Sequence, residues 1–220
     1  EEKSYSLDRL GIPLIEIGTA PDIKTPEQCQ EAAKKIGMLL RSLPGVKRGL
    51  GTIRQDVNVS IAGGQRIEIK GAQDLRQLPL LVELEAKRQQ ELLKIRDELK
   101  GVKLSGLSII DVTPLFAATT ANLIKNTLAK KGLVLAVKLP CFAGFIGREL
   151  QPGRRLGTEF SDRARVRAGV GGIFHSDELP RYGISEPEVE SVRKKLGCKN
   201  SDAFVLVADN EKKAHLALEA

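Results

Sequence analysis

Three carboxylates in the first third of the chain could take part in metal or phosphate chemistry. Each stands beside isoleucine or valine in a short segment: Glu16 in 6–22, Asp56 in 52–61 and Glu68 in 65–71. Alternation of this kind places a charge on one face of a β-strand and hydrocarbon on the other. Because Asp and Glu are poor strand formers, three of them in strand context indicate a role beyond packing.

The second and third segments are predicted to form a β-hairpin. Their connection, 62–64, contains two glycines, which supply the positive φ that short hairpin loops need. Opposed residues must share a face, so the expected register pairs Asp56 with Lys70 and Asn58 with Glu68. Gln55 is the one misfit on the apolar side. The other face then presents a mixed set of charged and polar side chains: Arg54, Asp56, Asn58, Glu68 and Lys70.

Two interpretations of this hairpin face follow from the residues. In the first, it is a solvated sheet surface whose cross-strand ion pairs each contribute little to stability. In the second, it is an oxygen-rich site for Mg²⁺, a hard ion that binds carboxylates together with substrate phosphates, and the basic side chains assist the phosphates. The sequence matches neither the phosphate-loop motif nor the dinucleotide fingerprint, so any nucleotide site would be of another kind.

Capping signals and periodicity predict the elements that would position these residues. Helices are expected at 26–41, 74–99, 119–131, 158–167 and 186–196, and further strands at 133–140, 172–175 and 203–209, before a last helix. Thr25 and Ser185 each begin a capping box. The helix at 74–99 carries an apolar stripe that should pack on a sheet, made of Leu81, Leu84, Leu92, Ile95 and Leu99. The alternation of helices and strands after residue 111 indicates an α+β or α/β layer.

A cluster of arginines marks the second half. It comprises Arg148, Arg154, Arg155, Arg163, Arg165 and Arg167. Residues 112–220 contain 17 Lys and Arg against 12 Asp and Glu, whereas residues 1–111 contain 18 against 16. The arginine fork suits phosphate contact, so the cluster is a candidate RNA surface. The alternative is a solvated surface paired internally with Glu159 and Asp162. His175 is expected to bond locally and to have no catalytic role.

Composition narrows the class of protein. The net charge of +7 fits a polyanionic partner, whereas the aromatic content of 4%, without Trp, argues against stacking of single-stranded bases. No apolar run has the length of a membrane span and no signal peptide opens the chain, so we expect a cytoplasmic location without membrane contact. The three cysteines are expected to be reduced structural thiols, because they are odd in number and lack C-x-x-C spacing.

Three motifs resemble the catalytic "cradle" of the tRNA-dependent amidotransferases, the B/E subunit family. They are G-I-P-L-I-E-I-G-T-A-P-D, R-Q-D-V-N-V-S-I and I-E-I-K-G, in this order. The resemblance implies that Glu16, Asp56 and Glu68 are metal and catalytic acids and that Lys70 is a basic catalytic residue. With Lys70, Arg54 and Asn58 would face ATP. The family's early E-x-H motif does not occur here, so we expect a fragment that is inactive alone.

A second resemblance covers the rest of the chain. L-P-C-F-A-G-F-I-G, G-R-R-L-G-T-E-F, G-V-G-G-I-F-H-S-D-E-L-P and D-A-F-V-L-V-A-D look like a module shared by bacterial-type aspartyl-tRNA synthetases and the archaeal E-subunit branch of the same family. It implies two domains, part of the cradle at 1–110 and the insert at 111–220. The expected fold class is α+β, with a mainly antiparallel cradle followed by a small α/β insert.

The two resemblances together imply a specific reaction. The family uses ATP and Mg²⁺ to phosphorylate the γ-carboxyl of glutamate on Glu-tRNA(Gln), and ammonia then displaces the phosphate to give Gln-tRNA(Gln). The ammonia would come from an asparaginase-like D subunit, with which a heterotetramer is expected. The competing hypothesis is a non-catalytic module for tRNA binding or assembly, in which the carboxylate face is structural.

Overall fold

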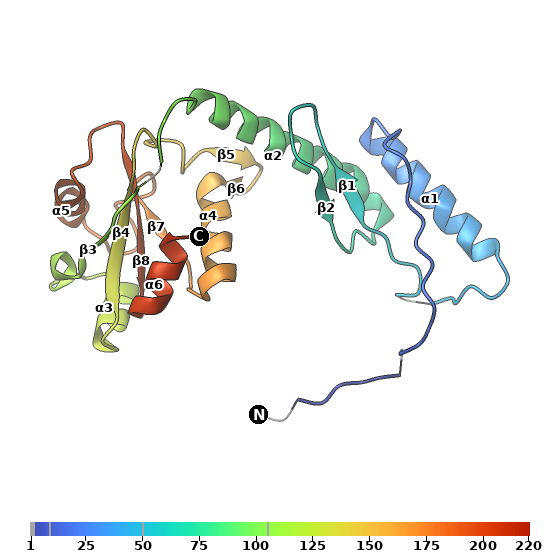
Figure 1. The fold of residues 1–220 in the computed structure, drawn as a ribbon, viewed down its shortest axis with the longest axis horizontal. Coiled ribbons are helices and arrows are strands. Elements are labelled where there is room, and N and C mark those ends of the chain that lie inside the picture. Colours follow the sequence, from blue (N-terminus) through green and yellow to red (C-terminus); the bar gives the residue numbers. More distant parts are fainter. Residues whose placement is uncertain (1–2, 9, 50, 105) are drawn as a thin grey trace. The chain divides into compact units, whose positions relative to one another are not determined.

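The computed structural model describes residues 3–8, 10–49, 51–104 and 106–220. The described residues form two compact units, one of residues up to Val57 with Lys70–Val82 and one of Asn58–Ile69 with Glu83–Ala220. Figure 1 shows the chain in both units. Helices and antiparallel strands are mixed along the sequence, so the expected α+β class is confirmed. The predicted domain boundary at 110/111 stays a prediction.

In the first unit, helix α1 (Pro26–Ser42) begins where the capping box predicts. The Gln28 amide N–H donates to the Thr25 hydroxyl, and the Thr25 N–H donates to Gln28 Oε1, both at 3.2 Å. The helix is joined to the short 3₁₀ helix η1 (Leu75–Gln77), because Gln30 Nε2 donates to the Leu75 carbonyl at 2.8 Å. Helix α2 (Leu78–Glu98) follows η1 directly, so the helix predicted at 74–99 is confirmed.

The strand predicted around Glu16 is wrong for this structure. Arg9 lies outside the described residues, and no strand is assigned to the described residues of 6–22. The isoleucines that flank Glu16 are 86% and 53% exposed. A strand needs a neighbouring ladder for its backbone groups and a surface for its apolar face, and the described residues supply neither here. Period-2 alternation alone therefore does not form this strand.

The second unit is built on a four-stranded sheet with the order β3-β4-β8-β7. Its members are β3 (Ile109–Asp111), β4 (Leu133–Leu139), β7 (Phe174–His175) and β8 (Ala203–Asp209). β4 and β8 form the centre and pair antiparallel along their whole length, from Leu133 opposite Asp209 to Leu139 opposite Ala203. All pairings are antiparallel, so the α/β character expected for this half is corrected to α+β.

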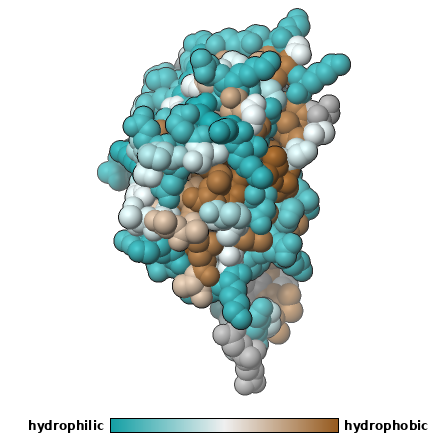
Figure 2. Space-filling model, turned by 90° about the vertical axis from the view of Figure 1, so that its left-hand side faces the viewer, coloured by the Kyte–Doolittle hydropathy of each residue, from teal (hydrophilic) through white to brown (hydrophobic). Residues whose placement is uncertain are grey.

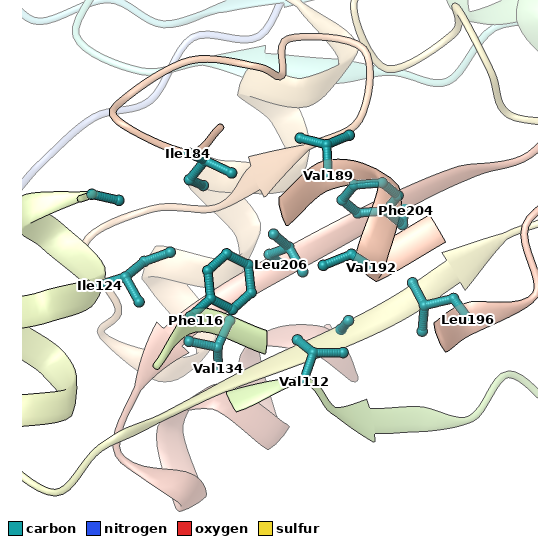
Figure 3. Close-up of a cluster of buried hydrophobic side chains, with 12 residues drawn as sticks. Val112, Phe116, Ile124, Val134, Ile184, Val189, Val192, Leu196, Phe204 and Leu206 are labelled. Atoms are coloured by element: carbon teal, nitrogen blue, oxygen red, sulfur yellow. The ribbon is translucent and has the colours of Figure 1, made fainter. Parts of the chain in front are cut away.

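Helices bury both faces of this sheet, which explains why the middle residues of its two central strands, 134–137 and 204–207, are all apolar. On one face, Val134 and Leu206 pack with Phe116 of η2 (Thr113–Phe116), Ile124 of α3 (Asn122–Ala129) and Val192 of α5 (Glu186–Leu196). Figure 3 shows these side chains converging from strands and helices. The other face meets α4 (Leu156–Ala168) and α6 (Glu211–Leu218).

Three short strands were not predicted. β5 (Glu149–Gln151) and β6 (Arg154–Arg155) form a small antiparallel hairpin inside the segment expected to be a glycine-rich connection. β3 was also missed, and it pairs with β4 through Ile110 opposite Ala136. These strands are two or three residues long, so their own sequences carry little periodic signal.

Figure 2 shows one face of the molecule, where hydrophobic residues gather in a patch among hydrophilic ones. Among the described residues, most of the large hydrophobic side chains that are exposed lie before residue 44.

Within the part of the chain that the structure describes, none of the helices combines the length and the apolar character needed to cross a bilayer.

Candidate functional site: a polar hairpin and the helix that holds it

The predicted hairpin is present, but its paired strands are shorter than expected. β1 (Val57–Val59) and β2 (Ile67–Ile69) form a two-stranded sheet. The turn is closed by the Gly64 N–H, which donates to the Ile61 carbonyl at 3.0 Å, and Gly63 adopts φ of 77°. The predicted glycine loop is therefore confirmed.

Exposure alternates along the hairpin as the sequence predicts. The polar residues Arg54, Asp56, Asn58 and Glu68 are exposed, whereas the apolar residues between them are partly or fully buried. The misfit, Gln55, lies on the less exposed side, where its Nε2 donates to the Ala72 carbonyl at 2.5 Å. That hydrogen bond explains how an amide is accommodated among apolar neighbours.

Asp56 and Lys70 lie together, as the predicted register requires. Lys70 Nζ is 3.7 Å from Asp56 Oδ2, and the Gly71 N–H donates to Asp56 Oδ1 at 2.8 Å. The side chains of Lys70 and Asp56 are 73% and 41% exposed, so this ion pair adds little stability. Both side chains are in contact with solvent.

The remaining predicted acids have different positions. Glu68 lies on the exposed side of β2, and Glu16 lies in the extended, exposed segment that precedes α1. Within the described part of the chain, no group of three or more His, Cys, Asp or Glu side chains is arranged to hold a metal ion. The metal role of Glu16, Asp56 and Glu68 therefore stays a prediction.

Sequence reasoning missed a buried polar cluster in α2 beside the hairpin. Glu85 and Gln89 are 8% and 4% exposed. Gln89 Nε2 donates to Glu85 Oε1 at 2.8 Å and to the Val59 carbonyl at 3.2 Å, while Gln89 Oε1 accepts from the Ile61 N–H at 3.4 Å. The available signal was spacing, because Glu85 lies seven residues from both Leu78 and Leu92 and so shares the buried face of the helix.

Arg88 extends this cluster toward the C-terminal half. It donates two hydrogen bonds to Glu85, at 2.8 and 3.2 Å, and its Nη1 lies 3.4 Å from Glu159 Oε1 on α4. The hydrogen bond with Glu85 raises the pKa of Arg88. Glu159 also accepts a hydrogen bond from Arg154 at 2.6 Å. A continuous set of alternating charges thus joins α2 to α4 and β6.

Arg148 and Arg154 are the two members of the arginine cluster with strong internal partners. Arg148 bonds to Glu98 at 2.6 Å and to Glu91 at 3.5 Å, both on α2. Arg154 bonds to Glu159 and, at 2.8 Å, to Asp162. The hydrogen bonds to Glu98 and Glu159 raise the pKa values of Arg148 and Arg154 respectively. For Arg154, the predicted alternative of internal pairing is confirmed.

The other four arginines are exposed: Arg155, Arg163, Arg165 and Arg167. Arg163 donates to the Ala220 carbonyl, and Arg165 donates to the Gly171 carbonyl at 3.3 Å. A carbonyl partner leaves the arginine charge uncompensated. Arg165 also lies 4.0 Å from Asp162, at the limit of an ion pair.

His175 is buried at the end of β7 and bonds locally, as predicted. Its Nε2 is 3.4 Å from Glu178 Oε2, and its Nδ1 is the one buried side-chain N or O atom without a hydrogen-bond partner in the described part of the chain. Burial lowers the pKa of His175, although Glu178 and Asp177 act in the opposite direction. Gly157 of α4 packs against the imidazole, where a Cβ would lie 2.7 Å from Nε2.

Comparison with known proteins identifies the family. The GatB/GatE catalytic domain matches residues 1–178. The chain is 57% identical over 218 residues to the E subunit of glutamyl-tRNA(Gln) amidotransferase from Methanocaldococcus jannaschii, covering 98% of this chain and 35% of that protein. It is 58% identical over 222 residues to the E subunit from Pyrococcus horikoshii, covering 99% and 35%. The chain thus spans about a third of the length of these curated relatives. By this match, the chain belongs to the GatB/GatE catalytic domain family.

Proposed function

We propose that this chain is part of an ATP-dependent amidotransferase that converts Glu-tRNA(Gln) to Gln-tRNA(Gln), and that the hairpin takes part in its phosphoryl transfer. The observation that carries the proposal is the family match over residues 1–178, which includes every acidic and basic residue of the hairpin. The relatives are glutamyl-tRNA(Gln) amidotransferase proteins by name, and that name supplies the substrate.

The reaction has two steps. A γ-carboxylate oxygen of the glutamyl group bonds to the γ-phosphorus of ATP, and ADP leaves. The ammonia nitrogen then bonds to the activated acyl carbon, inorganic phosphate leaves with the C–O bond electrons, and the nitrogen loses a proton. Because phosphoryl transfer depends mainly on positioning and on stabilising charge, exposed acidic and basic side chains on a β-hairpin suit this chemistry.

The exposed side chains fit divalent metal binding in their chemistry. Asp56 is open to solvent and keeps lone pairs beyond its bonds to Gly71 and Lys70. Carboxylate oxygens are the ligands that Mg²⁺ prefers. The described residues bring no three acids together, so the proposal of Asp56, Glu68 and Glu16 as its protein ligands is supported by the family resemblance and by the chemistry of the carboxylates. A bound Mg²⁺ would offset charge on the ATP phosphates.

The neighbouring polar groups would bind ATP directly. Lys70 and Arg54 would donate to phosphate oxygens, because both side chains reach solvent. Asn58 would contribute an amide donor. Each of these side chains is exposed, so none has to leave a buried position.

For tRNA contact, we propose the outer surface of α4 and its start. Arg155, Arg163, Arg165 and Arg167 are exposed there. Arg148 and Arg154 would instead serve mainly to join α4, β5 and β6 to α2, because carboxylates already hold them. We therefore propose that four arginines contact tRNA, instead of the six that the sequence suggests.

The nitrogen source would be a second protein. We propose an asparaginase-like D subunit that releases ammonia, assembled with the E subunit as a heterotetramer in the cytoplasm. The relatives are named as one subunit of their amidotransferase, which supports an assembly of several different chains.

The test compares Gln-tRNA formation by the full-length protein, with its partner, Mg-ATP and ammonium, for the parent, Glu68→Ala and Asp56→Asn. Loss of product by several orders of magnitude, with tRNA affinity preserved, supports the proposal. Parental product levels in both variants would favour the competing hypothesis, a tRNA-binding or assembly module whose carboxylate face is structural.

A further inference from the structure

Gln89 of α2 bonds to the hairpin of the second unit. Gln89 is almost completely buried, and its amide bonds to the carbonyl of Val59 and to the N–H of Ile61. These two backbone groups belong to the last residue of β1 and to a residue two positions beyond it. In a parallel sheet, the N–H and the C=O of one residue on the neighbouring strand bond to such a pair. The Gln89 amide therefore takes the place of such a residue.

The orientation of this amide is fixed by its own partners. Glu85 Oε1 and the Val59 carbonyl are both acceptors, so the Gln89 nitrogen must face them and its oxygen must face Ile61. Glu85 is in turn held by the two hydrogen bonds from Arg88. Three successive groups, from Arg88 through Glu85 to Gln89, thus have one arrangement that satisfies all of them.

The hairpin is shaped to accept this amide. A Cβ added at Gly64 would collide with Gln89 Oε1 and would lie 2.9 Å from Ile61 Cγ1. Gly64 has no positive φ, so close approach of Gln89 explains glycine at this position better than backbone conformation does. The same strands carry Asn58 and Glu68, which belong to the proposed ATP and metal site.

We propose that Gln89 is a positioning residue, which fixes the backbone at Val59 and Ile61 and thereby the placement of Asn58 and Glu68 for phosphoryl transfer. This inference rests on the proposed function. Gln89 touches no substrate and acts only through the hairpin backbone. Because misplacement of reacting groups by about 1 Å can lower a rate about a hundredfold, loss of the amide should affect the chemistry more than it affects RNA binding.

The test uses full-length protein with its partner and measures kcat, KM for ATP and tRNA affinity. Gln89→Met keeps the side-chain length but removes the amide, and Gln90→Met is the matched control on the exposed side of the same helix. We expect kcat/KM for ATP to fall about ten- to a hundredfold in Gln89→Met, with tRNA affinity within about twofold of the parent. Gln90→Met should stay within about twofold in every quantity.

A second variant approaches the contact from the hairpin. Gly64→Ala leaves Gln89 present but displaces its amide, so kcat/KM should fall several-fold. Because both changes break the same hydrogen bonds, the double variant should lose less than the product of the two single effects.

Three results distinguish the proposals. Parental kinetics in Gln89→Met, with Glu68→Ala inactive, would overturn the positioning role alone. Fully multiplicative effects of Gln89→Met and Gly64→Ala would also overturn it. Parental activity in Glu68→Ala would remove the hairpin from the reaction, and both proposals would fail.

Discussion

Replacing Arg88 with methionine tests whether the buried charges hold α2, the hairpin and α4 together. The change removes both hydrogen bonds to Glu85 and the contact with Glu159. The side chains of Arg88 and Glu85 are 16% and 9% exposed, so Glu85 would be left as a carboxylate that is shielded from water. Its described partner would then be the neutral amide of Gln89.

The magnitude follows from these contacts. Breaking a buried ion pair by removing one partner costs about 3–5 kcal/mol, because the remaining charge is uncompensated. Partial exposure of Arg88 favours the low end of this energy range. Loss of the contact with Glu159 adds little to the cost, because Glu159 still accepts a hydrogen bond from Arg154. We therefore expect the local free energy of opening to fall by about 3 kcal/mol, which corresponds to an opening constant on the order of a hundredfold larger.

Native-state hydrogen exchange measures this quantity, because amide protection reports the free energy of local opening. Amides in the hairpin and in α2 should lose protection in Arg88→Met. Arg96→Met is the matched control, since Arg96 pairs with Asp97 on the exposed surface at 3.0 Å. We expect this control to change the opening free energy by less than about 0.5 kcal/mol.

A double variant separates charge burial from packing. Adding Glu85→Gln to Arg88→Met removes the unpaired, buried carboxylate. The double variant should therefore regain more than half of the amide protection that Arg88→Met loses. Two results would refute this reasoning: unchanged protection in Arg88→Met, or a double variant as destabilised as the sum of the two single changes.

Two further predictions follow from His175 and from the exposed arginines. Burial lowers the His175 pKa below its ordinary value of 6.5. At a pH between the two pKa values, His175 is protonated in the unfolded chain but neutral in the folded chain. The free energy of unfolding should therefore decrease as pH falls from above 6.5 toward the folded pKa. Protection of β8 amides, corrected for intrinsic exchange, should therefore fall with pH in the parent but less in His175→Gln; equal pH dependence would contradict this. The double variant Arg163→Gln and Arg167→Gln should weaken tRNA binding and make its dependence on salt shallower by about 0.7–0.9 per lost phosphate contact. An unchanged salt dependence would place the RNA elsewhere.

The sequence predicts best those elements whose signals are local. Helix α5 begins directly after its N-cap Ser185 and ends at Leu196, before the C-cap Gly197, which adopts φ of 60°. β8 matches its predicted range of 203–209, because a continuous apolar run fits a strand that is buried on both faces. The exposed polar side of the hairpin is likewise present, because alternation along a strand depends only on neighbouring residues.

Partners distant in sequence explain what was missed. β3 is three residues long and is defined by its pairing with β4, while the segment around Glu16 has strand alternation but no strand assigned. Glu85 and Gln89 show the same limit in the candidate site. Their positions on the buried face of α2 follow from helical spacing, but their acceptors and donors on the hairpin follow only from the fold.

The arginines show how far charge alone can locate a nucleic-acid surface. Arg154 and Arg163 have the same side chain and lie nine residues apart, yet Arg154 is held by two carboxylates and Arg163 is exposed and bonds to a carbonyl. The charge of an arginine that is already paired with carboxylates is largely compensated, so it attracts a phosphate less strongly than an exposed arginine does. The net charge counts paired and exposed arginines equally, so it overestimates the number of arginines that can bind RNA. If the outer side of α4 binds tRNA, the salt dependence attributable to this cluster should correspond to about four phosphates at most, rather than six.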